Sequence, residues 1–266
     1  MSGKLCIMTL VLPAEFVYIE EWVEFHLKQG FDHVYLYLIY KNTEQYDIDL
    51  FNMQIDRYKD NNKVKLSCLK WPPHGFQDHI ATFLKNEASH HQDDWLCPLD
   101  IDEFIYSPIK DKSVKDIVHE YEENNIAAVH VNWKCFGSNG LISRPESVLK
   151  SFIKCGEPNH PNNYSTKSIV KINTITGIDN SHRFHVKRPY HTTCGMVPTY
   201  AKANFRIYLE NEPRLIINHY IVRSKDEYQM KIQHNPHRAD RYNWEFFDTI
   251  NKMHNTIENT DILKKL

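Results

Sequence analysis

The fold class is decided by the stretch KLCIMTLVLPAEFVYIEEWVEFHLKQGFDHVYLYLI, residues 4–39. Residues 4–12 form an unbroken apolar run that Pro13 ends, which indicates a buried strand. The following residues place apolar side chains at helical spacing up to Gly30, a frequent helix terminator. Residues 33–39 then return to a strand pattern. A strand, a helix and a strand within about forty residues have the size of one β-α-β unit.

The same alternation continues to about residue 135. Further strands are predicted at residues 64–70, 94–102 and 126–134. Helices are predicted from a Thr43 cap to about Tyr58, over residues 76–91, and over residues 113–123, where Ser113 and Asp116 form a capping box. We therefore expect an α/β fold with a mostly parallel central sheet that is flanked by helices.

The C-terminal half is less regular. Residues 139–200 are rich in Asn, Pro, Ser, Thr and Gly, a composition typical of a binding loop or lid. Order is expected again in a strand at 214–222, in a helix that Ser224 and Glu227 open as a second capping box, and in a helix at 240–254. No repeat or linker divides the chain, so we expect one domain over residues 1–266.

The composition excludes several classes of protein. The net charge is −2 and no long Lys/Arg block occurs, so a nucleic-acid partner is not expected. The apolar start LCIMTLVLP is too short to cross a membrane and is followed by acidic residues, unlike a signal peptide, so we expect a cytoplasmic protein with no membrane span. Six scattered cysteines without a CxxC pair favour buried, reduced thiols over disulfides or zinc. The oligomeric state stays open.

An acidic cluster stands out in WLCPLDIDEFIY, residues 95–106. If the strand continues through these acids, Asp100 and Asp102 point to the same face, at the carboxyl edge where open α/β sheets bind ligands. Close carboxylates become tolerable when Mg²⁺ or Mn²⁺ binds between them, usually together with substrate phosphates. Taken alone, the motif equally fits a solvated strand end that caps the next turn.

Several blocks together resemble glycosyltransferase family 92, and through it the wider GT-A glycosyltransferases. The resemblance rests on Glu15 and on four blocks in family order: EWVEFHLKQGFDHVYLY at 21–37, WLCPLDIDEF at 95–104, WKCFGS at 133–138 and HYIVRS at 219–224. Two positions depart from the family pattern. LIYKNT at 38–43 replaces an Asp-Asn-x-Ser continuation, and Leu141 stands where a histidine often follows the FGSNG turn.

The resemblance implies a GT-A-like enzyme that moves a hexose from a nucleotide sugar, first of all a UDP-sugar, to a hydroxyl of a glycan or glycosylated acceptor, with inversion. The cofactor would be Mn²⁺ or Mg²⁺. Residues 1–135 would form the nucleotide and metal half, and residues 136–266 the acceptor side. The residues implied as metal ligands are Asp100, Asp102 and His219. Those implied on the donor side are Glu15, Asp100 and Arg223, the last standing where the family has lysine. Lys167 in KSIVK is a further donor-side candidate that borders the diphosphate, or is only a charge on a strand face.

No motif identifies the base that inverting transfer requires. Asp179 is our first candidate because it lies in the loop-rich half, and Glu103 and Glu146 are alternatives. For other motif residues we favour structural roles: Trp22 and Trp133 as core residues, and His26 as a hydrogen-bonded packing residue. Two alternative functions stay open. One is a non-catalytic, carbohydrate-binding relative, and the other is a phosphohydrolase of the haloacid-dehalogenase kind, which also carries a DxD at a strand end.

Overall fold

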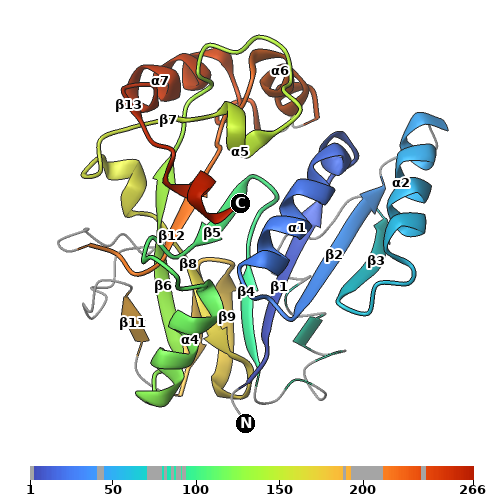
Figure 1. Cartoon of the computed structure of the whole chain (residues 1–266). Helices are drawn as coiled ribbons and strands as arrows, with labels where there is room; N and C mark the ends of the chain where they lie inside the picture. Colours follow the sequence, from blue (N-terminus) through green and yellow to red (C-terminus); the bar gives the residue numbers. More distant parts are fainter. Residues whose placement is uncertain are drawn as a thin grey trace.

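The structure is a computed structural model with an α/β fold (Figure 1). The residues that it describes are 3–40, 45–70, 80, 83–84, 87, 91, 94–187, 190–192, 212–234 and 238–266.

The first β-α-β unit forms as predicted. Strand β1 (Leu5–Val11) leads through the 3-10 helix η1 (Pro13–Tyr18) into helix α1 (Ile19–Lys28), and strand β2 (His33–Tyr40) returns parallel to β1. Gly30, which directly follows α1, has a φ of 93°, a conformation that favours glycine. The apolar run therefore forms the predicted strand, and the predicted helix ends just before Gly30.

The remaining elements up to residue 135 also follow the predicted order. They are helix α2 (Gln45–Tyr58), strands β3 (Val64–Lys70), β4 (Trp95–Pro98) and β5 (Glu103–Tyr106), helix α4 (Val114–Glu123) and strand β6 (Ala128–Cys135). The capping box of Ser113 and Asp116 opens α4. The predicted cap Thr43 and most of the predicted helix at 76–91 lie outside the described residues. One prediction was wrong: the strand expected at 94–102 ends at Pro98, and a new strand starts at Glu103.

The C-terminal half contributes short helices, a hairpin and three strands of the central sheet. The elements are α5 (Val148–Ser151), β7 (Lys154–Cys155), η3 (Pro161–Tyr164), β8 (Thr166–Lys171), η4 (Ile172–Thr174), β9 (Ile175–Asn180), β10 (Arg183–Val186), β11 (Tyr190–Thr192), β12 (Ile216–His219), α6 (Lys225–His234), α7 (Trp244–His254), β13 (Ile257–Glu258) and η6 (Asp261–Lys265). Residues 193–200 of the predicted loop-rich stretch lie outside the described part of the chain.

The central sheet has the order β3-β2-β1-β4-β8-β6-β12-β5 within the described residues, and β11 pairs with β6. Strands β3, β2, β1 and β4 are mutually parallel, as are β6, β11 and β12. Strands β8 and β5 run antiparallel to their neighbours. The sheet is therefore mostly parallel, and segments from both halves of the chain build it.

Both faces of the sheet are buried, which explains why β1 has no polar alternation. On one face Leu5 and Ile7 of β1 join a core with Trp22 of α1, and on the other face Cys6 and Met8 join a second core. Figure 1 shows α6 and α7 at the top of the view, the end toward which β1 and β2 point. None of the helices in the described ranges combines the length and the apolar character that a membrane crossing requires.

Candidate active site

The DxD motif lies on a tight turn between β4 and β5 and not on a strand. The backbone N–H of Asp100 donates to Glu103 Oε2 at 2.8 Å, and the backbone N–H of Glu103 donates to the Asp100 carbonyl at 3.0 Å. These two hydrogen bonds close the turn around Ile101 and Asp102. We predicted that strand alternation makes the two aspartates point to the same face, and this prediction was wrong. The turn does follow the carboxyl end of β4, as expected.

Each aspartate of the motif pairs with a different lysine. Asp100 Oδ2 accepts from Lys167 Nζ at 2.8 Å, and Asp102 Oδ2 accepts from Lys231 Nζ at 3.3 Å. Burial alone would raise the pKa of both carboxyls, but Lys167 lowers the pKa of Asp100, and Lys231 lowers the pKa of Asp102, below the usual range. Both aspartates are therefore ionised at neutral pH.

Glu103 is enclosed and does not face solvent. Its side chain is fully buried and lies 3.4 Å from Lys167 Nζ, which also donates to Ser181 Oγ at 3.1 Å. Burial raises the pKa of Glu103 to about 8, against the opposing attraction of Lys167. The predicted donor-side residue Lys167 is itself only 1% exposed, so its ammonium acts within the acidic cluster.

His219 stands at the end of β12 and faces Asp102. Its Nε2 lies 3.7 Å from Asp102 Oδ1, and its ring packs against Trp133 with centroids 4.2 Å apart. Burial lowers the pKa of His219 to about 4, so the imidazole is neutral at physiological pH and keeps a lone pair. The structure thus brings two of the three predicted metal ligands together. The third, Asp100, has a side chain that is 47% exposed and is paired with Lys167.

Arg223 and Glu15 lie next to this pair. Arg223 is buried, has a φ of 55° and stacks its guanidinium over the Tyr18 ring at 4.2 Å. Its Nη1 lies 3.8 Å from Glu15 Oε1, while its buried Nε and Nη2 form no hydrogen bond with any residue that the structure describes. Burial raises the pKa of Glu15 to about 7, with Arg223 acting in the opposite direction. A buried guanidinium with idle donors suits an oxygen-rich anion.

The predicted base candidates occupy different surroundings. Asp179 lies on β9 at the surface, where its carboxylate pairs with Arg183 at 3.1 Å and with His185 at 2.8 Å. Glu146 is exposed in the segment before α5. The turn between β9 and β10 reaches the acidic cluster through Ser181, but Asp179 pairs within its own hairpin. The described structure therefore brings Glu103, and not Asp179, into direct contact with the predicted metal and donor residues.

The comparison with protein families decides the identity of the chain. The family model that matches is glycosyltransferase family 92, over residues 4–264. The chain belongs to glycosyltransferase family 92. The resemblance drawn from the four motifs is confirmed, because the match covers nearly the whole sequence.

Comparisons with solved structures give distant likenesses to this family 92 chain. A mannosyltransferase from Pyrobaculum calidifontis, solved with GDP-Man and Mn²⁺, is 12% identical with a TM-score of 0.42; the match covers 90% of this chain and 63% of that one. A nucleoside-diphosphate-sugar pyrophosphorylase from Vibrio cholerae is 13% identical, with a TM-score of 0.31 and coverages of 63% and 66%. Core-mannan synthase A from Aspergillus fumigatus, in its Mn/GDP form, is 11% identical, with a TM-score of 0.27 and coverages of 52% and 44%. A search among curated proteins gives no match.

The first motif of this family 92 chain, on helix α1, binds the backbone just after the DxD turn through the side chains of Trp22 and His26. Trp22 Nε1 donates to the Glu103 carbonyl at 2.8 Å, and the Ile105 N–H donates to His26 Nε2 at 3.3 Å. His26 Nδ1 in turn donates to the Trp22 carbonyl at 2.8 Å. Glu21 accepts from the first backbone N–H groups of α5, which Val148 and Leu149 supply at 2.7 and 3.2 Å. The structural roles expected for Trp22 and His26 agree with these contacts.

Of the two departures from the family pattern, the structure fully describes only Leu141. Leu141 is partly buried against the core, and its carbonyl accepts from the Lys225 N–H at 3.1 Å, which ties the FGSNG turn to the start of α6. Residues 41–43, where the Asp-Asn-x-Ser pattern is missing, lie outside the described residues. Sequence reasoning overlooked Lys231, which no motif marks.

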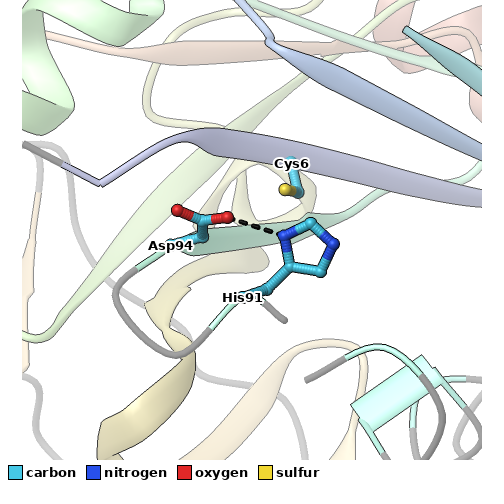
Figure 2. Close-up of side chains that lie close together, drawn as sticks. All are labelled: Cys6, His91 and Asp94. Atoms are coloured by element: carbon cyan, nitrogen blue, oxygen red, sulfur yellow. Dashed lines mark hydrogen bonds and ion pairs between the residues drawn. The ribbon is translucent and has the colours of Figure 1, made fainter. Parts of the chain in front are cut away.

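A second group of potential metal ligands lies elsewhere in the fold. Figure 2 shows Cys6, His91 and Asp94, the one set of three ligand atoms within 4.8 Å of one another in the described ranges. The His91 Nδ1–H donates to Asp94 Oδ2 at 2.6 Å, and His91 Nε2 accepts from Tyr35 at 2.8 Å. Burial raises the pKa of the Cys6 thiol above its usual range. Both imidazole nitrogens of His91 thus form hydrogen bonds, which connect Asp94 to Tyr35 of β2.

Proposed function

We propose that this chain is a metal-dependent hexosyltransferase that uses a nucleotide sugar, with a UDP-sugar as the first expectation, and transfers the sugar with inversion to a hydroxyl of a glycan acceptor. One observation supports the proposal most strongly. Asp102, on the turn after the carboxyl end of β4, and His219, at the end of β12, face each other, with Asp102 Oδ1 and His219 Nε2 3.7 Å apart. Family membership supports the reaction class and leaves the phosphohydrolase alternative without support.

The residues around Asp102 fit a divalent cation. An ionised carboxylate and a neutral imidazole face each other across a gap that is too long for a hydrogen bond. Mn²⁺ and Mg²⁺ accept such donors, and these ions commonly take only one or two protein carboxylates and complete their shell with substrate phosphates. Asp102 and His219 would hold the ion, and Asp100 would take part after release from Lys167. When bound, the cation would neutralise charge on the departing nucleoside diphosphate.

Cationic side chains beside Asp102 supply the rest of the donor site. Arg223 offers two buried nitrogens, Nε and Nη2, whose N–H groups are unpaired within the described residues, and Lys231 stands next to the Asp102 carboxylate. Oriented donors in a buried site stabilise developing negative charge more strongly than donors in water. We assign Arg223 and Lys231 to the diphosphate, and Glu15 to holding the Arg223 guanidinium in place.

The acceptor would approach past Trp133. This residue lines a cavity of about 450 Å³ together with amide side chains, among them Asn159 and Asn163. The Trp133 ring itself packs on His219, with centroids 4.2 Å apart. An aromatic ring with neighbouring amides is a common environment for a sugar.

Thermal unfolding with nucleotides tests the proposal. Wild-type protein is mixed with Mn²⁺ and, separately, with UDP, GDP and a panel of nucleotide sugars, without acceptor. One nucleoside diphosphate at a hundredfold excess over its Kd is expected to stabilise by about 2.7 kcal/mol, which raises Tm by roughly 5–10 °C for a chain of this size. Slow, Mn²⁺-dependent donor hydrolysis is expected with the matching sugar.

The controls separate the metal pair from general effects. Asp102→Asn and His219→Gln should lose the Mn²⁺-dependent part of the shift, whereas Asp56→Asn, which changes an exposed carboxylate of α2, should keep it. Circular dichroism shows whether each variant is folded. If no nucleotide changes Tm in the presence of Mn²⁺, the transferase proposal fails. If donor binding occurs without any donor cleavage, a carbohydrate-binding relative is the better description.

A further inference from the structure

His182 is held rigidly at the turn between β9 and β10. Its backbone N–H donates to Asn180 Oδ1 at 2.9 Å, and its carbonyl accepts from Ser168 Oγ at 2.8 Å. Its Nδ1–H donates to the Thr166 carbonyl at 2.7 Å. Because a carbonyl can only accept, this bond places the ring proton on Nδ1 and leaves the lone pair on Nε2. Nε2 forms no hydrogen bond with any residue in the described ranges.

The ring of His182 lies close to the metal pair, with Trp133 between them. Its centroid lies 5.5 Å from that of Trp133, which lines the cavity and packs on His219. The preceding residue, Ser181, accepts from Lys167, which binds Asp100. The hairpin therefore carries an oriented, unprotonated nitrogen to the side of the proposed metal and donor residues.

We propose that His182 is the base of the transfer reaction, an inference that rests on the proposed function above. Nε2 takes the proton of the acceptor hydroxyl as that O–H bond breaks. The acceptor oxygen forms the new bond to the anomeric carbon, and the old bond from that carbon to the phosphate oxygen breaks. Its electron pair leaves with the nucleoside diphosphate, so the charges balance when the imidazolium forms.

The surroundings of His182 keep it available for this role. Burial lowers its pKa to about 4, and the nearby Lys167 acts in the same direction, while Asp100 opposes it and His219 lowers it further. The ring is therefore neutral at pH 7, with a basicity similar to that of an ordinary aspartate, whose pKa is about 3.9. The other candidates are less accessible or occupied: Glu103 is fully buried, and Asp179 is paired with Arg183 and His185.

The experiment compares proton transfer with donor binding. His182→Ala and His182→Gln are assayed for Mn²⁺-dependent release of nucleoside diphosphate from the donor identified above, with water as the acceptor. The Tm shift by the nucleoside diphosphate is measured in the same samples. We expect the release rate to fall at least 100-fold, the usual scale for losing a positioned base, with the Tm shift retained. Added imidazole should restore part of the rate of His182→Ala. His185→Ala, on the exposed side of the same hairpin, should keep the wild-type rate.

The remaining outcomes contradict either the proposed function or the role of His182. A wild-type protein with neither Tm shift nor release overturns the proposed function and this inference with it. Wild-type activity with His182 variants within threefold of it overturns the inference alone. A slow but folded His182→Ala that imidazole does not accelerate also overturns it, because His182 would then only position the hairpin. If His182→Ala does not fold, His182→Gln decides between these outcomes.

Discussion

Acid should destabilise this fold through His26, a motif residue buried under the DxD turn. The ring is completely enclosed and sits 5.6 Å from Phe104 in a stacked geometry. Its Nδ1–H donates to the Trp22 carbonyl, and its Nε2 accepts from the Ile105 N–H. The neutral tautomer satisfies both contacts. A second ring proton, on Nε2, would point at the N–H of Ile105, so protonation requires the hydrogen bond between Ile105 and His26 to break.

The size of the effect follows from the shifted pKa. Burial lowers the pKa of His26 from 6.5 to about 3. Between these values the unfolded chain binds the proton and the folded chain does not, so the free energy of unfolding falls as pH falls, by 1.36 kcal/mol per unit. From pH 7.5 to pH 5, about 1.5 units lie below the unfolded pKa, which gives a loss of ~2 kcal/mol from His26 alone. That is a large part of a typical stability of 5–15 kcal/mol.

Guanidinium unfolding at pH 7.5 and pH 5, at equal ionic strength, measures this loss. His26→Gln keeps one donor and one acceptor but cannot titrate, so it should be less stable than wild type at pH 7.5, with a gap that narrows by ~2 kcal/mol at pH 5. Phe31→Leu is the matched control, because Phe31 packs on the His26 ring without titrating and its gap should not change with pH. A His26→Gln gap that stays constant within about 0.5 kcal/mol would refute the reasoning.

Four further outcomes are expected. Lys167→Met removes the partner that Glu103 and Asp100 share; because Glu103 is mostly neutral and Asp100 is half exposed, the change should cost ~1.5–3 kcal/mol in guanidinium unfolding, and a loss below ~0.5 kcal/mol would show that the cluster needs no partner. Glu21→Ala removes the acceptor of two α5 backbone N–H groups and should cost ~1–2 kcal/mol in the same assay; an unchanged stability would contradict the cap. Gly137→Ala places a Cβ 2.7 Å from Asn255 Cγ and should cost ~1–3 kcal/mol, partly recovered by Asn255→Ala; a neutral Gly137→Ala would contradict the packing. EDTA should leave the Tm of the nucleotide-free protein unchanged within a degree or two, because lysines already pair with both aspartates; a large drop would reveal a structural metal.

Local patterns in the sequence were sufficient for much of the fold. The apolar runs at β1 and β2, the Gly30 stop and the two capping boxes depend on neighbouring residues, and all of them appear in the structure. The turn at residues 99–102 was missed because LDID alternates like a strand. What ends the strand is the hydrogen bond from the Asp100 N–H to Glu103 and the pairing of β5 with β12, and the second of these is a contact between distant segments.

The composition of the site was predictable only in part, for the same reason. Asp102 and His219 were expected from motifs and Lys167 was a donor-side candidate, but Lys231 and the pairing of each lysine with one aspartate were not predicted, because both lysines come from far along the chain. Lys167 is 67 residues from Asp100, and Lys231 is 129 residues from Asp102. No local pattern reports such a distance. His182 was missed because its position depends on a hairpin whose turn reaches the cluster only in the folded chain.

The third acid of the cluster explains how the DxD turn is stable before any ligand binds. With a pKa raised to about 8, Glu103 is mostly neutral at pH 7, so the ammonium of Lys167 is left to balance Asp100. Lys231 balances Asp102. Glu103 therefore adds a hydrogen-bond acceptor that fixes the turn without adding a full charge. On the proposed function, a donor diphosphate would meet a turn that its own hydrogen bonds already fix. On the proposed function, a cation that binds Asp102 would compete with Lys231, whose ammonium lies 3.3 Å from Asp102 Oδ2.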